Sequence, residues 1–252
     1  MYKILANTVF LGKDIHFMTE CHSTNDIAME KIKRKEVSEG SIIITESQIK
    51  GKGQRGSQWW SEPGKNLTFS IILRPVFLRP HQQFDLSKIV CLALHEELSV
   101  YDRQIKIKWP NDLFHEKQGK VCGVLIENII NQKCVEHSVV GIGLNVNQIE
   151  FPFPGSSSLQ NISGQQIDLN DLFSKLISKI ERWYLQLKKG DQRAINEQYL
   201  SHLLGYREWA KYDDGEVFQG FIQGMNEEGK IIIEKRGGEH VTYGLKEVKF
   251  LL

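Results

Sequence analysis

The sequence Gly51-Lys52-Gly53-Gln54-Arg55-Gly56 places three glycines among basic side chains, between apolar stretches at residues 40–45 and 66–73. Glycine allows positive φ and close approach to a ligand, and the basic side chains attract anions. The stretch before the loop is β-branched and the stretch after it alternates like a half-buried strand, so the loop joins strand to strand. Phosphate loops and dinucleotide fingerprints open a helix instead, and neither fits here. Taken alone, such a loop is typical of a solvated hairpin connection.

Length and composition are those of an ordinary soluble globular protein, with 252 residues, 40% hydrophobic and 25% charged. That length fits one large domain, or one medium domain with a small satellite. The net charge of +1 is too small to hold DNA nonspecifically. The sequence has neither the apolar core of a signal peptide nor an apolar run of about 18 residues. We therefore expect a cytoplasmic protein with no membrane segment.

The cysteines and histidines do not form a recognisable site by spacing. The four cysteines are widely scattered, without a CxxC pair: Cys21, Cys91, Cys122 and Cys134. We expect reduced, buried thiols rather than a zinc site or a disulfide framework. The histidines are equally dispersed, and no Ser–His–Asp or Cys–His grouping is visible.

Hydrophobic periodicity predicts a chain of strands and amphipathic helices. Besides the two stretches that flank the glycine loop, the expected strands are residues 14–19, 105–109, 119–127 and 138–147. The expected helices are residues 25–35, 84–101 and 169–188. From about residue 205 the pattern changes to short alternating segments at residues 216–222, 230–234, 240–243 and 247–250. We expect one domain at residues 1–204 and a second at 205–252, the second in the size range of an SH3-like barrel.

Four polar clusters fall at strand ends or at strand-to-helix turns. They are residues 23–25, the loop at residues 48–56, the turn at residues 111–112, and Lys120 facing the strand at residues 141–145. A basic loop can enclose anions, Asp112 can hold Mg²⁺, and a strand-borne lysine can bridge charges. The set therefore suits a carboxylate substrate together with a nucleotide.

Two further patterns point to the same region. Trp59 and Trp60 are adjacent, so in a strand one can line a site while the other lies in the core. In residues 138–147, glycine alternates with aliphatic residues, so one face of that strand carries almost no side chains. Such glycines are unfavourable in a strand unless a ligand or another backbone lies close against that face.

In order and separation, these motifs resemble those of the biotin–protein ligase family. They are Ser23-Thr24-Asn25, Gln48 with the glycine loop, Lys108-Trp-Pro-Asn-Asp112, Lys120-Val-Cys-Gly123, and Gly141-Ile-Gly143-Leu-Asn145. The resemblance covers nearly the whole chain. It implies an α+β fold, in which helices flank the mixed β-sheet of a class II synthetase-like catalytic domain and a small C-terminal SH3-like β-barrel follows.

The resemblance implies a two-step reaction. Biotin and ATP form biotinyl-5′-adenylate and pyrophosphate, and the biotinyl group then passes to a lysine of the biotin carboxyl carrier domain of a biotin-dependent carboxylase. Two anions must meet in the first step, so cations have to neutralise them as charge builds. The implied small molecules are biotin, ATP and Mg²⁺.

The resemblance also implies a role for each matching residue. Lys120 and Lys52 are the implied catalytic residues, and Asp112 is the implied magnesium ligand. The implied biotin-binding residues are Ser23, Thr24, Asn25, Gln48, Gly51, Lys52, Gly53, Gln54, Lys120, Gly123, Gly141 and Gly143. The implied ATP- and adenylate-binding residues are Lys52, Arg55, Trp59, Asn111, Lys120 and Asn145.

The chain departs from the family pattern in two places. The family loop is commonly Gly-Arg-Gly-Arg-Arg-Gly, whereas Lys52 and Gln54 stand here for two of its arginines. Lysine lacks the bidentate fork of arginine and glutamine lacks the charge, so we expect weaker retention of the adenylate. The Ser23 motif begins close to Met1, so we expect the enzyme-only type without the helix-turn-helix domain of some members, and no binding to DNA.

Other interpretations stay open from the sequence. A lipoate–protein ligase or octanoyltransferase shares the catalytic architecture, although the polar residues at 23–25 and 48 favour a polar head group. A non-catalytic biotin sensor is a second alternative, against which the intact Lys120 argues. An exposed sheet edge could pair with another copy, giving a homodimer, or with the acceptor.

Overall fold

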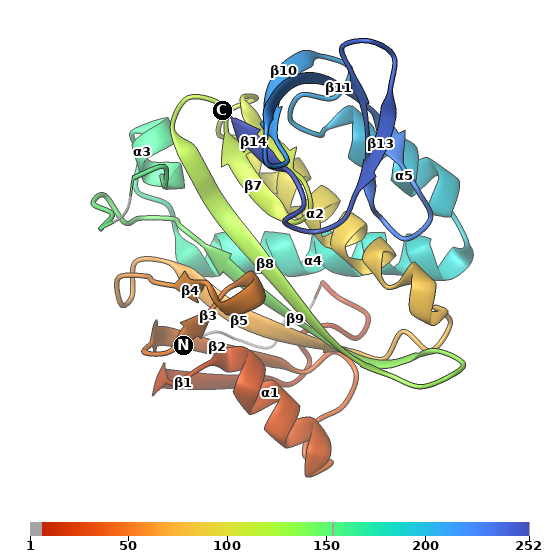
Figure 1. The fold of residues 1–252 in the computed structure, drawn as a ribbon. Helices are drawn as coiled ribbons and strands as arrows, with labels where there is room; N and C mark the ends of the chain where they lie inside the picture. The colour runs from red at the N-terminus through yellow and green to blue at the C-terminus, as the bar shows by residue number, and fades with distance from the viewer. Residues whose placement is uncertain (1–6, 153, 252) are drawn as a thin grey trace.

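The computed structural model describes residues 7–152 and 154–251, and the backbone alone of Arg55. Its main sheet has seven strands in the order β1-β2-β5-β9-β8-β7-β6 (Figure 1). β1 and β2 run parallel, whereas every other neighbouring pair in this sheet is antiparallel. The strands are β1 (Ile15–Cys21), β2 (Ile42–Gln48), β5 (Leu67–Leu73), β6 (Ile105–Lys108), β7 (Asp112–His115), β8 (Gly119–Ile130) and β9 (Val135–Leu144). The sheet is therefore mixed, as expected.

Helices lie on both faces of this sheet (Figure 1). They are α1 (Thr24–Lys33), α2 (Phe84–Leu98), α3 (Leu159–Ser163), α4 (Leu169–Lys189) and α5 (Gln192–Ser201). Capping residues bound two of these helices: the Ser23 side chain caps α1, and Asp168 and a left-handed Gly190 bound α4. The second predicted helix ends at Leu98, with Ser99 as its C-cap, and does not continue to residue 101; Val100 beyond it is exposed to solvent.

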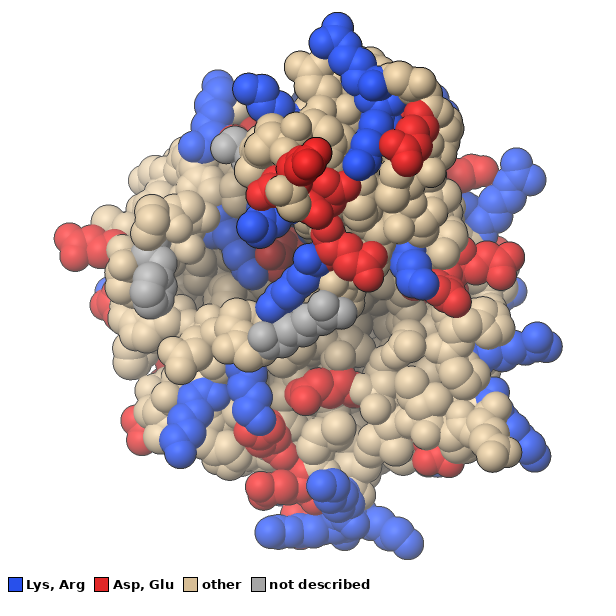
Figure 2. All heavy atoms as spheres, viewed as in Figure 1, with Lys and Arg blue, Asp and Glu red and all other residues tan. Residues whose placement is uncertain are grey.

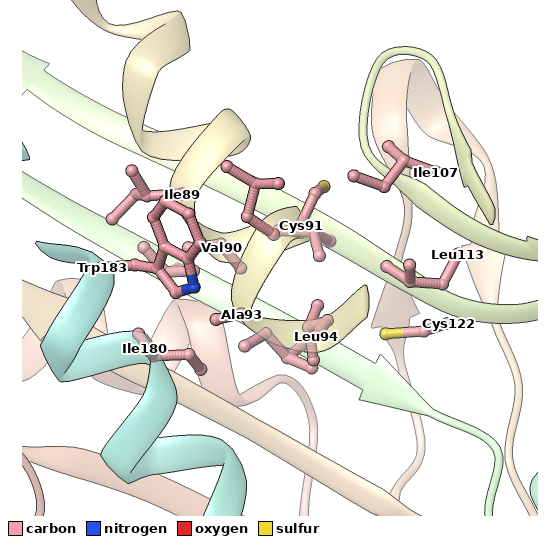
Figure 3. Packing of buried hydrophobic residues seen from close by; sticks show 14 of the residues in the cluster. Ile89, Val90, Cys91, Ala93, Leu94, Ile107, Leu113, Cys122, Ile180 and Trp183 are labelled. Carbon is pink, nitrogen blue, oxygen red and sulfur yellow. The ribbon is translucent and has the colours of Figure 1, made fainter. Parts of the chain in front are cut away.

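The main hydrophobic core lies between the sheet and the pair α2 and α4. In Figure 3, Ile180 and Trp183 of α4 lie on one side of α2, and Leu113 and Cys122 on strands lie on the other. α1 packs on the opposite face, where its Ala28 joins a small separate cluster with residues of β2, β5 and β9. Both faces of the central strands are therefore covered.

This double coverage corrects one prediction. The alternating stretch at residues 66–73 suggested a half-buried strand, but all seven residues of β5 are buried. Leu67, Phe69 and Ile71 face the main core, while Ile72 packs beneath α1 and Ser70 bonds to that helix. The polar residues of the alternation face a buried polar network instead of solvent.

A second sheet follows the main sheet in the chain and consists of five antiparallel strands in the order β13-β12-β11-β10-β14 (blue in Figure 1). Its strands are β10 (Trp209–Asp213), β11 (Val217–Met225), β12 (Ile231–Lys235), β13 (His240–Tyr243) and β14 (Lys249–Leu251). Such a sheet matches the expected small SH3-like unit. It docks on the first sheet where Trp109 Nε1 donates to Gly229 O at 3.0 Å. The domain division after residue 204 stays a prediction.

Several short elements escaped prediction. β7 was assigned to a turn, and β10, α3 and α5 were not predicted. The glycine loop itself contains β3 (Gly51–Lys52), a 3₁₀ turn η1 (Gln54–Gly56) and β4 (Gln58–Trp59), and a further turn η2 (Pro80–Gln82) precedes α2. Because β3 and β4 pair with each other, the loop is a hairpin that projects from the main sheet.

All four cysteines are unpaired thiols, as predicted. Three are buried, whereas Cys134 is partly exposed, so its predicted burial is only partial. Burial raises the pKa of the Cys122 thiol well above its ordinary value, which keeps that thiol protonated and unreactive. No helix within the described residues has the length and apolar character needed to span a bilayer.

Candidate active site

A cleft of about 290 Å³ opens between the N-terminus of α1, the β3–β4 hairpin, and strands β8 and β9. Most of the predicted site residues line it: Ser23, Thr24, Asn25, Gln48, Lys52, Gly53, Gln54, Trp59, Asn111, Asp112, Lys120, Gly123, Gly141 and Gly143. Residues that are up to 120 positions apart in sequence therefore meet in one cavity, as the spacing of the motifs predicted. Whether each performs its predicted role stays a prediction.

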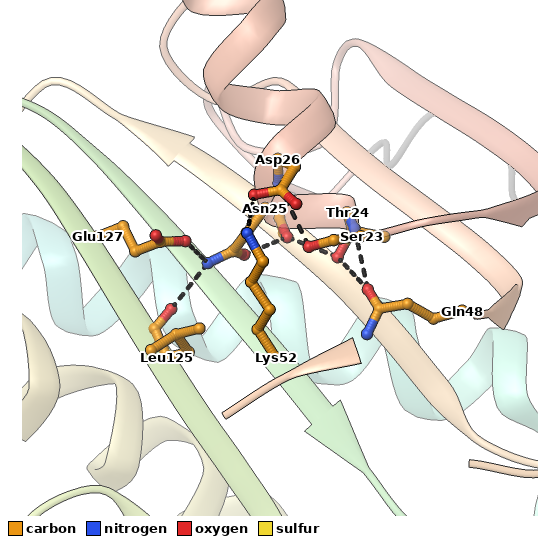
Figure 4. A network of polar contacts seen from close by, with 9 residues as sticks. Ser23, Thr24, Asn25, Asp26, Gln48, Lys52, Leu125 and Glu127 are labelled. Carbon is orange, nitrogen blue, oxygen red and sulfur yellow. Dashed lines mark hydrogen bonds and ion pairs between the residues drawn. The ribbon is translucent and has the colours of Figure 1, made fainter. Parts of the chain in front are cut away.

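A buried hydrogen-bond network closes the α1 end of the cleft (Figure 4). The Thr24 backbone N–H donates to Gln48 Oε1 at 2.9 Å. Because that amide oxygen is held by a backbone donor, the Gln48 Nε2 group points the other way, and it lies 2.7 Å from the place where a Cβ on Gly51 would stand. Gly51 is therefore required by packing, although it does not line the cleft itself.

The glycine face of β9 is covered by side chains. A Cβ on Gly141 would lie 2.3 Å from Asn25 Oδ1, and a Cβ on Gly143 would lie 2.3 Å from Cε2 of Trp59. Contacts this short exclude any larger residue without rearrangement. In this structure an amide and an indole ring lie against these glycines, and the closeness of a ligand to the same face stays a prediction.

Lys120 and Asp112 form the charged centre of the cleft. Lys120 Nζ lies 2.8 Å from Asp112 Oδ1, and the two side chains are 33% and 26% exposed. The same Nζ lies 5.7 Å from the ring centroid of Trp59 and close above Gly123. Burial lowers the pKa of the neighbouring Lys108. The positive charge of Lys120 lowers this pKa further, whereas the negative charge of Asp112 raises it. An anion that entered this space would meet a lysine on the floor of the cleft.

A family model described as the biotin/lipoate A/B protein ligase family matches residues 18–145, just over half of the chain. The chain belongs to this family. It is 28% identical over 244 residues to the bifunctional ligase/repressor BirA of Bacillus spizizenii, a match that covers 94% of this chain and 74% of that protein. It is also 28% identical to the biotin–[acetyl-CoA-carboxylase] ligase of Paracoccus denitrificans, covering 81% of this chain and 88% of the relative.

A solved structure of a biotin protein ligase from Aquifex aeolicus, in complex with biotin and ATP, has the same fold. The two structures superpose with a TM-score of 0.76 at 26% identity, over 94% of this chain and 98% of that one. The mixed sheet with flanking helices is therefore the architecture of a biotin protein ligase, as the resemblance in the sequence implied.

Two of the residues that the family resemblance assigns to catalysis or to the nucleotide, Lys52 and Asn111, have partners within the protein in this structure. Lys52 Nζ lies 2.6 Å from Asp26 Oδ1 at the rim, half exposed, and the hydrogen bond with Asp26 raises its pKa. Asn111 is buried and its amide nitrogen donates to Val124 O, so it joins β7 to β8. The side chain of Arg55 lies outside the described residues.

Asn145 lies beside the cleft, and only one of the two polar groups of its side-chain amide has a hydrogen-bond partner among the described residues. Its Nδ2 donates to Ser157 O at 3.0 Å and its backbone N–H donates to Val121 O at 2.9 Å. Its Oδ1 is buried and has no hydrogen-bond partner among the described residues, and the same is true of Trp59 Nε1. A buried acceptor without a donor is unfavourable, so Asn145 Oδ1 is suited to an N–H group of a ligand.

Sequence reasoning missed one basic residue of the cleft. Lys246, in the turn between β13 and β14, also lines the cavity, and its Nζ donates to Gln54 O at 3.3 Å. The C-terminal sheet therefore reaches the glycine loop directly. Because 192 residues separate Lys246 from Gln54, no local pattern marks this contact in the sequence.

Proposed function

We propose that this chain is an ATP-dependent biotin–protein ligase, which forms biotinyl-5′-AMP and transfers the biotinyl group to a lysine of a biotin carboxyl carrier domain. Family membership, two relatives named as biotin ligases or ligase/repressors, and the fold of a ligase that binds biotin and ATP all support it. The observation that carries the proposal is the position of Lys120. Its side chain lies in the cleft between the polar residues at the α1 end and the indole ring of Trp59.

In the first step, a carboxylate oxygen of biotin attacks the α-phosphorus of ATP and pyrophosphate leaves. Lys120 would neutralise the two anions as they approach, because its ammonium can donate to the carboxylate and to the phosphoryl oxygen at once. In the second step, the ε-amine of the acceptor lysine attacks the acyl carbon, AMP leaves, and the amine loses its proton.

We assign the α1 end of the cleft to the head group of biotin. Ser23, Thr24, Asn25 and Gln48 are polar and hydrogen-bonded there, which suits a cyclic urea that must exchange its bonds with water for bonds with the protein. Lipoate and octanoate carry no such polar head, so they could not use the donors and acceptors that remain at this end of the cleft. This polarity favours biotin over the lipoate branch of the family.

We assign the β3–β4 end to the nucleotide. The Trp59 ring offers a stacking surface for adenine, and the free Oδ1 of Asn145 suits its exocyclic amino group. Lys52 and Arg55 would follow the phosphates from the glycine loop, with Lys52 exchanging Asp26 for the ligand. Asn111 would act indirectly, by holding the strand that carries Asp112.

Magnesium would accompany ATP rather than occupy a protein cage. Among the described residues there is no cluster of three His, Cys, Asp or Glu side chains that could hold a metal, and Asp112 is the only carboxylate among those that line the cleft. Mg²⁺ commonly takes one or two carboxylates together with substrate phosphates, so Asp112 would fit as a single ligand. Such an ion would neutralise phosphate charge.

We further propose that the protein acts in the cytoplasm, where ATP and the carrier domain are found together. β1 is an edge strand of the main sheet, and it could pair with the acceptor or with a second copy in a homodimer. The face in Figure 2 mixes basic and acidic side chains without a large area of one sign, which favours a protein partner over DNA.

Incubation of the protein with a purified carrier domain, biotin, ATP and Mg²⁺ tests the proposal. Mass spectrometry should find the carrier domain heavier by one biotinyl group on one lysine, and pyrophosphate should be released. Parallel reactions with lipoate or octanoate should leave the carrier domain unchanged. Labelling by lipoate or octanoate but not by biotin would assign the chain to the other branch of the family, and binding of biotin without transfer would make it a sensor.

A further inference from the structure

Glu127 lies just outside the cleft, on the same strand as two residues that line it. In β8, residues 123, 125 and 127 project from one face, and Gly123 and Leu125 line the cavity. Glu127 Oε2 accepts a hydrogen bond from Asn25 Nδ2 at 2.7 Å (Figure 4). Leu125 O is a second, more distant acceptor for the same amide, at 3.4 Å.

A carboxylate can only accept hydrogen bonds, so Glu127 determines which way round the Asn25 amide stands. With Nδ2 held by Glu127, Oδ1 is left to face Ser70 Oγ at 2.6 Å. The single hydrogen of the Ser70 hydroxyl must then go to this amide oxygen. Thr24 Oγ1, 2.7 Å from Ser70 Oγ, consequently donates its own hydrogen to Ser70.

The direction of every bond in this row therefore depends on the acceptors of Asn25 Nδ2, of which Glu127 is the nearer one and the charged one. Thr24, Asn25 and Ser70 are at most 4% exposed, so water cannot replace a lost partner. If Asn25 turned its amide over, Nδ2 would donate to Ser70, and the hydroxyls of Ser70 and Thr24 would reverse toward Gln48 Oε1, 3.3 Å from Thr24 Oγ1. Without Glu127, only the longer contact with Leu125 O favours the observed arrangement, because the hydroxyl groups are satisfied in both.

The two arrangements present different groups to the cleft. In the observed one, Asn25 Oδ1 stands over Gly141, which lines the cavity, and the lone pairs of Thr24 Oγ1 stay available. Gln48 Nε2 supplies a donor beside them. This end of the cleft thus offers two acceptors and one donor, the complement of a cyclic urea with its two N–H groups and one carbonyl.

We propose that Glu127 is a positioning residue for the recognition of the cyclic urea, which acts by fixing the Asn25 amide with its oxygen toward the ligand. The proposal rests on the proposed function, since it takes biotin as the ligand. Asp26 and Lys52 are the charged groups nearest to this row: Lys52 Nζ pairs with Asp26 Oδ1, and Glu127 adds to the negative field around that ammonium.

Glu127→Ala tests the proposal by calorimetry with biotin and, separately, with ATP. Loss of a buried hydrogen bond to a charged group predicts about ten- to hundredfold weaker binding of biotin. Binding of ATP should stay unchanged within error, whereas the melting temperature should fall slightly because Asn25 loses a buried partner. Glu127→Gln should restore binding to within about threefold, because a glutamine oxygen can still accept from Asn25. Glu136→Ala, on the neighbouring strand, is the control.

A double-mutant cycle with Asn25→Ala separates positioning from general destabilisation. If Glu127 acts through Asn25, adding Glu127→Ala to Asn25→Ala should weaken biotin binding no further. Additive losses, or an equal loss of ATP binding, would overturn the inference even if the single variants were unstable. Absence of biotin binding by the unaltered protein would instead refute the proposed function itself, so the two failures are distinguishable.

Discussion

The two ends of the cleft differ in how completely their polar groups are bonded within the protein. At the α1 end, Thr24 and Asn25 are buried and tied to Gln48, Ser70 and Glu127. At the hairpin end, the described groups include a buried indole N–H and a buried amide oxygen without partners.

The hairpin is also less enclosed. Its Lys52 side chain is 50% exposed, and Trp60 beside it is 49% exposed. Its contacts beyond its own strands include the Lys52–Asp26 ion pair and the hydrogen bond from Lys246. Exposed pairs of this kind contribute little stability. The α1 end is therefore built during folding, whereas the hairpin end would be completed by the nucleotide that we propose binds there.

The largest expected effect comes from Lys120, which stands between the two ends. Lys120→Ala should lower transfer of biotin to the carrier domain by about 10²–10³-fold, because a charge aimed at the transition state is lost. Binding of biotin at the α1 end should fall by much less. The assay is single-turnover labelling alongside calorimetry, with the exposed Lys117→Ala as control. Full activity of Lys120→Ala would contradict the proposed role of Lys120 in neutralising the two anions between the ends of the cleft.

A smaller effect is expected on the KM for ATP, where replacement of Trp59 should differ from replacement of its neighbour Trp60. Trp59→Ala should raise the KM for ATP about tenfold, since stacking of a base on an aromatic ring is worth about 1–3 kcal/mol. The KM for biotin should change little. Trp60→Ala is the matched control, because Trp60 is exposed and is not among the residues that line the cleft. Equal effects of the two changes on ATP would contradict the assignment of the nucleotide end.

The smallest expected effect concerns Gln54, where the family loop commonly carries an arginine. Gln54→Arg should slow the escape of biotinyl-5′-AMP by about two- to fivefold, the range of an exposed charge interaction. Stopped-flow release of the adenylate measures it, with Gln198→Arg on α5, an exposed position away from the cleft, as the control. Equal release rates for the native protein and Gln54→Arg would show that the hairpin already closes as tightly as an arginine-rich loop.

Much of the site could be predicted because its motifs sit where strands end. Ser23, Gln48, Lys120 and the β9 glycines were read from local patterns, and the fold brings them to one cleft. Local patterns could not show that Trp59 and Asn25 cover those glycines, or that Glu127 and Lys246 reach the same place, since these contacts join distant segments.

The errors in the fold have similarly physical causes. β7 has only four residues and begins at Asp112, which reads as a turn residue. Trp60 was a candidate for the core but is exposed, because it follows a two-residue strand in a projecting hairpin. β5 was taken as half-buried because its alternating Thr68 and Ser70 are polar, yet both are buried under α1 or beside the cleft. The polar side chains of this strand suggested contact with solvent, whereas they face the buried polar network and the cleft.

The contrast between the two ends can be measured directly by amide hydrogen exchange, in the free protein and with biotin and ATP added. Residues 42–48 should be protected in every state. Residues 51–59 should exchange rapidly in the free protein and become protected when both ligands are present. Strong protection of residues 51–59 without ligand, or slow exchange gained at residues 42–48 only on binding, would contradict a preformed biotin end and a ligand-completed nucleotide end.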